Sequence, residues 1–206
     1  MPPSHRDQQF LDDLREALEA SVDFFSPHRK CERELWDCEA FLSNLSVSFE
    51  ASELLPQVDD PPDVVFRDAR FETKEIMDPG RRRHQEYKEA LAKAKSAKDP
   101  REMLEEYHPQ YLTPEEIGSL VQAELDGLVN RYEPQLVAKL DLLFYVNLKS
   151  HSIEAGPMPQ AARFAPYGWR SVSAFIRWGA LVLFAAPDAP EFIRERVGTL
   201  TFKEFS

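Results

Sequence analysis

The sequence predicts an α/β fold built on a mixed sheet. Residues 114–132 carry apolar side chains at helical spacing, and the near-continuous apolar run that follows at 139–150 is typical of a buried central strand. A helix followed by a buried strand indicates an αβ unit. Two short strand-like pieces within residues 61–76, "PPDVVFRDARFETKEI", predict a hairpin beside that unit. The apolar content of 43% and the aromatic content of 11% are those of a globular chain with a sizeable core.

The N-terminal part is predicted to be helical. Residues 6–25 form an amphipathic pattern that Pro27 interrupts, and residues 30–45 form a second one. A strand is expected at 46–51, and the following segment "LLPQVDDPPD" is expected to be a linker.

The middle and the C-terminal parts alternate between strands and helices. The hairpin is expected to turn at Asp68-Ala69, and a highly charged helix should follow within 81–99. The helix at 114–132 begins with a capping box of Thr113 and Glu116. One or two strands at 169–186 and a short helix from Pro190 complete the chain.

Charge and cysteine content limit the function classes. The net charge of −11 argues against a protein that coats nucleic acid without specificity, although residues 81–103 hold eight basic and four acidic side chains and are therefore locally basic. The spacing of His28, Cys31 and Cys38 does not suit one zinc ion, so buried thiols are expected. No apolar run approaches the ~20 residues of a membrane span, and no secretory signal is apparent, so a cytoplasmic protein is expected.

Asp63, Glu72 and Lys74 form the candidate site. A hairpin turning at Asp68-Ala69 puts Lys74 opposite Asp63, and residues two apart on a strand share a face. The Cα atoms of Asp63 and Glu72 would then lie roughly 7–8 Å apart, close enough for both carboxylates to hold one Mg²⁺ ion. A lysine beside the ion can orient a metal-bound water. The alternative for these residues is a strand cap at Asp63 and a solvated strand face at Glu72 and Lys74.

These residues resemble a known nuclease pattern. Pro62-Asp63 followed by Glu72-x-Lys74 is similar to the motif of the PD-(D/E)XK nuclease superfamily, and the element order resembles its core of helix, three-strand meander, helix and strand. More narrowly, the whole chain resembles a bacterial family of endonucleases of otherwise unknown function. The resemblance implies a single nuclease-like domain over 1–206 with a restriction-endonuclease-like core. Its expected parts are a core at about 30–150, a basic helical insertion at about 79–112 and a C-terminal extension at 151–206.

The resemblance also implies roles for individual residues. Asp63 and Glu72 would bind Mg²⁺ or Mn²⁺ together with the backbone carbonyl of Thr73, and Lys74 would position the nucleophilic water. Glu39 matches the place of a glutamate that the superfamily often has on its first core helix. The further candidates are a glutamine in the site (Gln85 or Gln122) and basic side chains that hold phosphates (Arg81, Arg82, Arg83 and Lys88).

The expected function is metal-dependent hydrolysis of a nucleic-acid phosphodiester bond, with DNA expected over RNA as the partner. Nucleases of this type that cut two strands usually pair two sites, which would make the chain a homodimer. The first alternative is a non-catalytic protein of the same fold that binds nucleic acid or protein. The second is an interaction module in which Glu72 and Lys74 are only a solvated face.

Overall fold

A computed structural model describes residues 5–58 and 61–203 of the chain. The chain divides into two compact units. The first takes the residues up to 33 and residues 79–108, and the second takes residues 34–78 and those from 109 on. Most of the expected basic insertion therefore lies in the first unit, and the assignment of the whole chain to a single domain stays a prediction.

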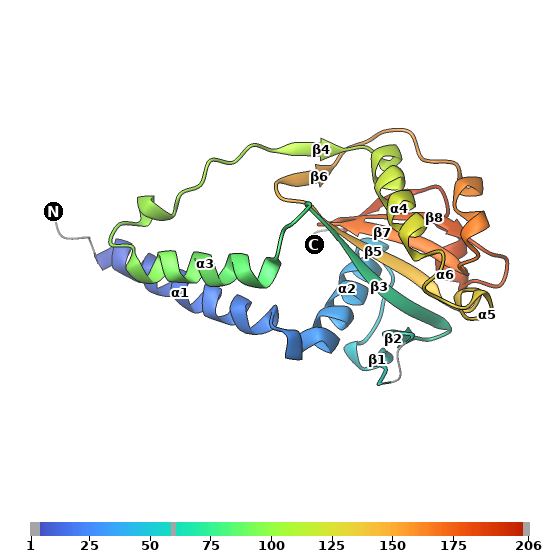
Figure 1. Cartoon of the computed structure of the whole chain (residues 1–206), viewed down its shortest axis with the longest axis horizontal. Helices are drawn as coiled ribbons and strands as arrows, with labels where there is room; N and C mark the ends of the chain where they lie inside the picture. The colour runs from blue at the N-terminus through green and yellow to red at the C-terminus, as the bar shows by residue number, and fades with distance from the viewer. Residues whose placement is uncertain (1–4, 59–60, 204–206) are drawn as a thin grey trace. The chain divides into compact units, whose positions relative to one another are not determined.

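The first unit is a pair of helices, α1 (His5–Phe24) and α3 (Arg83–Ser96), which lie side by side (Figure 1). The guanidinium group of Arg15 joins them, because it donates hydrogen bonds to the carbonyl oxygens of Ala94 at 2.9 Å and Ala97 at 3.1 Å. These carbonyls lie at the C-terminal end of α3, where a helix has no partners of its own for them. Short 3₁₀ turns complete the unit at Pro27–Arg29 and Pro100–Met103.

The second unit is built on a seven-stranded mixed sheet in the order β1-β2-β3-β5-β7-β8-β9 (Figure 1). The three central strands β3, β5 and β7 run parallel, and every other neighbouring pair is antiparallel. The strands are β1 (Leu54–Pro56), β2 (Val64–Phe66), β3 (Ala69–Met77), β5 (Asp141–Asn147), β7 (Ser171–Ile176), β8 (Gly179–Ala185) and β9 (Leu200–Phe202). A separate two-stranded sheet pairs β4 (Gln110–Leu112) with β6 (His151–Ile153).

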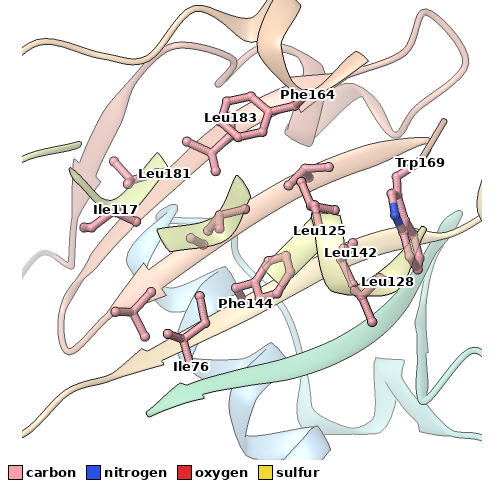
Figure 2. Close-up of a cluster of buried hydrophobic side chains, with 14 of the residues drawn as sticks. Ile76, Ile117, Leu125, Leu128, Leu142, Phe144, Phe164, Trp169, Leu181 and Leu183 are labelled. Carbon is pink, nitrogen blue, oxygen red and sulfur yellow. The ribbon is translucent and has the colours of Figure 1, made fainter. Parts of the chain in front are cut away.

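Helices cover both faces of the large sheet. On one face, α4 (Pro114–Leu128) packs its apolar stripe against β3, β5, β7 and β8 in a cluster that includes Leu142 and Phe144 (Figure 2). On the other face, α2 (Lys30–Asn44) contributes side chains to a second cluster with Phe71 and Leu143. The remaining helices are the short α5 (Pro134–Val137) and α6 (Glu191–Arg194) and the 3₁₀ turns at Ala51–Glu53, Ala161–Arg163 and Ala165–Tyr167.

This architecture confirms the predicted fold class. The order α2, β1–β2–β3 meander, α4, β5 is the predicted sequence of helix, three-strand meander, helix and strand. The sheet is mixed, as expected from the continuous apolar run that becomes β5.

Three local predictions are wrong. The segment 54–63, expected to be a linker, begins with strand β1 (Leu54–Pro56), which pairs with β2. No strand forms at 46–51, because a reciprocal capping box between Glu50 and Glu53 starts a 3₁₀ turn there and the first strand begins only at Leu54. The hairpin turns one residue earlier than predicted, since Phe66 pairs with Ala69 and leaves Arg67 and Asp68 in the turn. Arg67 adopts a left-handed φ of 53° in this turn, and its guanidinium group binds the Glu53 carboxylate at 3.0 Å, which joins the turn to the 3₁₀ turn at Ala51–Glu53.

The length and polarity of each helix show whether it could cross a membrane. Within residues 5–58 and 61–203, none of the helices has both the length and the apolar character that a membrane crossing requires.

Candidate active site

Strand β3 presents Glu72 and Lys74 on the face that α4 covers. In the parallel ladder to β5, Glu72 pairs with Leu142 and Lys74 pairs with Phe144. Paired residues of a ladder share a face, and both partners belong to the cluster packed against α4. The prediction that Glu72 and Lys74 point the same way is therefore confirmed, but α4 covers much of the face they share: the Glu72 side chain is buried and the Lys74 side chain is partly exposed.

Glu72 is the centre of a buried polar network. Its side chain is 1% exposed, and its Oε1 atom accepts hydrogen bonds from the Lys74 ammonium group and from the Tyr132 hydroxyl at 2.6 Å. Lys74 also donates to the backbone carbonyl of Thr73 at 3.1 Å. Tyr132 follows the end of α4, so the network joins β3 to the segment after that helix.

The second carboxylate oxygen of Glu72, Oε2, is buried but accepts no hydrogen bond from the described residues. Among the described residues, two buried side-chain polar atoms have no hydrogen-bond partner, Glu72 Oε2 and Ser173 Oγ. A desolvated carboxylate oxygen without a partner costs free energy, and proteins keep such groups mainly where a ligand, an ion or water completes them.

The network keeps its lysine and its tyrosine protonated. Burial alone would lower the pKa of Lys74, but the hydrogen bond and the charge of Glu72 raise it above its ordinary value of 10.5. Burial and the hydrogen bond to Glu72 likewise raise the pKa of Tyr132 above 10.0, although the Lys74 charge acts in the opposite direction. At neutral pH the site therefore holds a cationic lysine and a neutral phenol beside Glu72.

Asp63 does not lie opposite Lys74, so the predicted register is wrong at this position. Val64 pairs with Phe71, and the Asp63 amide also donates to the Phe71 carbonyl at 2.9 Å. Two residues therefore lie across from one, as in a β-bulge, and a bulge re-aims side chains. The Asp63 carboxylate instead accepts hydrogen bonds from the Thr73 amide at 2.8 Å and the Thr73 hydroxyl at 3.0 Å.

Asp63 and Asp37, which lies on α2, both act electrostatically on the Cys38 thiol. Burial raises the pKa of the Cys38 thiol well above its usual range, and the charges of Asp37 and Asp63 raise it further. Asp37 is 9% exposed and precedes Cys38 in the buried stripe of α2. One residue of the candidate site, Tyr132, was not predicted from the sequence. Tyr132 continues the apolar stripe of 114–132, which indicates a core residue, and the sequence carries no signal for its contact with Glu72.

The donor set fits a hard divalent cation to a limited extent. Glu72 Oε2 is a buried, unpartnered carboxylate oxygen of the kind such a cation binds, and Asp63 is a second buried carboxylate held by the neighbouring residue of β3. Within the part of the chain that the structure describes, no three or more His, Cys, Asp or Glu side chains gather as a metal centre. An ion here would therefore keep most of its coordination shell as water, as Mg²⁺ commonly does. The Thr73 carbonyl expected as a ligand accepts from Lys74.

The remaining residues expected in the core site lie elsewhere. Glu39 lines a separate pocket of about 290 Å³ with Trp36, Asn44, Arg177 and Trp178, because its position on α2 faces the turn between β7 and β8. The amide oxygen of Gln122 accepts two hydrogen bonds from Arg163, at 2.7 and 3.2 Å, which hold the 3₁₀ turn after β6 against α4.

The basic residues expected to hold phosphates, and Gln85, lie in the first unit. Arg81 is engaged with Glu86 at 2.8 Å, and the Arg83 guanidinium lies over the Phe25 ring at 4.0 Å. Arg82 and Lys88 are exposed. The Gln85 amide donates to Glu89 on the next turn of α3.

Comparison with known proteins adds a family and a fold relative. The sequence model of the family described as "Putative endonuclease, protein of unknown function (DUF1780)" matches residues 6–205. Among solved structures, the chain is similar to a protein of unknown function from Pseudomonas aeruginosa strain PAO1 that is described as belonging to the monooxygenase superfamily. The two chains are 28% identical, the TM-score is 0.65, and the match covers 95% of each chain. No curated protein matches the chain.

Proposed function

This chain belongs to the DUF1780 family, whose model matches residues 6–205, and we propose that it is a metal-dependent nuclease that hydrolyses nucleic-acid phosphodiester bonds at the Glu72–Lys74 site. The family description supports the reaction class, while the residues, the metal and the substrate are parts of the proposal.

The observation that carries the proposal is the state of the Glu72 carboxylate. One of its oxygens is shared by Lys74 and Tyr132, and the other is buried with no partner among the described residues. A carboxylate that served only the fold would gain stability from a second hydrogen bond. We take the unfilled oxygen as the place where a ligand of the reaction binds.

Glu72 of β3 would hold a Mg²⁺ or Mn²⁺ ion, and Asp63, which precedes β2 and is bound to Thr73, is the second proposed carboxylate of the site. Such an ion, when bound, lowers the pKa of a bound water and neutralises charge on a phosphate. Glu72 would bind the ion through Oε2, and Tyr132 fixes the rotamer of Glu72 through its hydrogen bond to Oε1. Lys74 would position the attacking water by donating a hydrogen bond to it.

Lys74 would act as a fixed positive charge. Its raised pKa keeps the ammonium group protonated at neutral pH, so it is unsuited to remove a proton from water. A preorganised ammonium group can instead donate to a phosphate oxygen as negative charge develops in the transition state. Binding of a phosphate would compete with Glu72 and Thr73 for the donors of Lys74.

The finer parts of the proposal follow the motif. DNA is the proposed substrate, and the exposed Arg82 and Lys88 of the first unit are the proposed contacts to its backbone. A homodimer would pair two sites for a two-strand cut, and the bacterial cytoplasm is the proposed location.

The test is cleavage of a supercoiled plasmid and of a single-stranded oligonucleotide with Mg²⁺ or Mn²⁺. The variants are Glu72→Gln and Lys74→Ala, and Lys139→Ala serves as a matched control because Lys139 is an exposed lysine of the same unit. We expect metal-dependent cleavage by the wild type and by Lys139→Ala, and its loss in the other two. Cleavage that persists in Glu72→Gln and Lys74→Ala would refute the assignment of the site.

A second candidate function is a non-catalytic protein that binds nucleic acid or protein through the same fold. Lys74 favours it, because its ammonium group already neutralises Glu72 and occupies the Thr73 carbonyl. This candidate predicts that the wild type binds an oligonucleotide but cleaves nothing, and that Mg²⁺ leaves the melting temperature unchanged.

A further inference from the structure

A pocket of about 250 Å³ lies directly beside the Glu72 network. Its walls come from the C-terminal end of α4, from α5 and from the segment before β7, all within the second unit. Half of the ten lining residues are aromatic or proline (Tyr132, Pro134, Pro166, Tyr167 and Trp169), and most of the others are leucine or valine. Tyrosine and tryptophan rings beside aliphatic side chains suit a flat, ring-shaped ligand.

The pocket and the network share Tyr132. Its hydroxyl group binds Glu72 at 2.6 Å, and its ring lies edge-on to the Trp169 ring with the centroids 5.3 Å apart. The Lys74 ammonium lies 5.8 Å from the centroid of the Tyr132 ring. A ligand stacked in the pocket would therefore be one side chain away from the carboxylate and the cation of the proposed site.

The aromatic walls are held in place by their own contacts. The Tyr167 hydroxyl donates to Asp126 on α4 at 2.5 Å, and Trp169 is 4% exposed within the cluster on the α4 face (Figure 2). Gly168 separates them with a left-handed φ of 77°, which turns the chain between the two rings. At the mouth, Val129 is 59% exposed.

We propose that this pocket binds an unpaired nucleobase of the substrate and so selects single-stranded or locally unpaired nucleic acid for the Glu72–Lys74 site. The inference rests on the proposed nuclease function and adds a substrate class to it. Bases stack on aromatic side chains with little dependence on sequence, whereas a paired base inside a duplex offers no free face. Lys74 would meet the phosphate attached to the stacked nucleotide.

The position of Val129 offers a matched pair of variants. Val129→Phe extends an aromatic ring at the mouth and should obstruct the pocket, and Val129→Ala leaves it open. Because Val129 is exposed and makes no contact with Glu72 in the network described above, both variants should fold and keep the proposed site intact. Circular dichroism and thermal melting would check their folding.

The experiment measures binding and cleavage separately. Binding is followed in EDTA by the fluorescence of a single-stranded oligonucleotide with one 2-aminopurine, and by the same strand in a duplex. We expect wild type and Val129→Ala to quench the single strand and to leave the duplex unchanged. Val129→Phe should bind at least about tenfold more weakly. With Mg²⁺, cleavage of the single strand should fall in Val129→Phe by a similar factor.

The outcomes separate the two proposals. Equal quenching and equal cleavage by Val129→Phe and Val129→Ala would overturn the base pocket while leaving the nuclease assignment untouched. Cleavage of a fully paired linear duplex as fast as of the single strand would also overturn it. Base-dependent quenching that Val129→Phe weakens, without cleavage by any form of the protein, would support the pocket and refute the nuclease function.

Discussion

Two carboxylates on neighbouring strands of the central sheet, Glu72 and Asp141, are equally buried at 1% exposure. They differ in how many of their oxygens accept hydrogen bonds. Both oxygens of Asp141 have donors. Oδ2 accepts from the Arg70 amide at 2.8 Å and from the Arg170 guanidinium, while Oδ1 accepts from Arg170 at 3.1 Å and from the Ser171 hydroxyl at 2.8 Å. Glu72 has donors at one oxygen only.

The difference separates a structural carboxylate from a candidate functional one. Asp141 ties the starts of β3, β5 and β7 together, and Arg170 extends the tie to the Asp68 carbonyl of the hairpin turn at 3.0 Å. Every donor around Asp141 stabilises the fold. Glu72 lies about one residue further along the same sheet and leaves part of its binding capacity unused.

The largest effect on stability is expected at Asp141. Asp141→Ala would leave Arg170 as a buried charge without its partner, which typically costs about 3–5 kcal/mol of unfolding free energy. Urea denaturation would measure it, with Asp188→Ala as a control because Asp188 is an exposed aspartate of the same unit. A loss no larger than that of the control would contradict the structural role of Asp141.

Glu72→Gln should reduce the stability less than Asp141→Ala does, and it should strongly reduce the cleavage activity. Glutamine keeps a carbonyl acceptor for Lys74 and Tyr132 but loses the charge that pairs with Lys74, so we expect a loss of about 1.5–3 kcal/mol of unfolding free energy, less than for Asp141→Ala. The rate of phosphodiester cleavage should fall by about 10²–10³-fold, as when one preorganised transition-state contact is removed. A variant that unfolds as readily as Asp141→Ala would show that Glu72 is also a structural residue.

Tyr132→Phe tests the link between the network and the pocket. It removes one hydrogen bond to a charged group, so cleavage should slow by about tenfold, while the ring that lines the pocket stays. Quenching of 2-aminopurine in EDTA should therefore remain as in the wild type. An unchanged cleavage rate would mean that Tyr132 does not position Glu72.

The stability of the protein should also depend on pH. This effect is smaller, and the stability should fall as the pH rises above 10. The folded-state pKa values of Lys74 and Tyr132 lie above the ordinary 10.5 and 10.0, so the folded protein binds both protons more tightly than the unfolded chain does. This contribution is fully present below pH 10 and is lost as the pH rises through the raised values. Urea denaturation from pH 8 to 11 should show a stability difference between the wild type and Lys74→Met that narrows above pH 10. A constant difference would contradict the pKa assignment.

The smallest effect is expected on nucleic-acid binding, from variants of exposed basic residues in the first unit. Arg82 and Lys88 are exposed, whereas Arg81 and Arg83 are engaged with Glu86 and Phe25. If Arg82 and Lys88 contact phosphates, Arg82→Ala and Lys88→Ala should each lower the slope of log affinity against log salt concentration by about 1. Fluorescence anisotropy with a labelled oligonucleotide would measure these slopes. A slope that neither variant changes would exclude contact by this segment.

Local patterns predicted most of the elements correctly. The periodicity of 114–132, the continuous run at 139–150 and the alternation in "RFETKEI" became α4, β5 and β3. The strand expected at 46–51 failed because a local capping box competes with strand pairing there. The site was predicted in part, since Glu72 and Lys74 share a face, but Asp63 and Glu39 do not join them in the expected way.

The sequence by itself determined the type and order of the elements and the shared face of Glu72 and Lys74, because these depend on the periods of helix and strand over a few residues. Only the tertiary structure decided the register at Asp63, the contact between Tyr132 and Glu72, and the hydrogen bonds to both oxygens of Asp141. Each of these depends on a turn geometry or on donors far away in the chain, and a shift of one residue in a hairpin changes what a side chain meets without changing the local pattern.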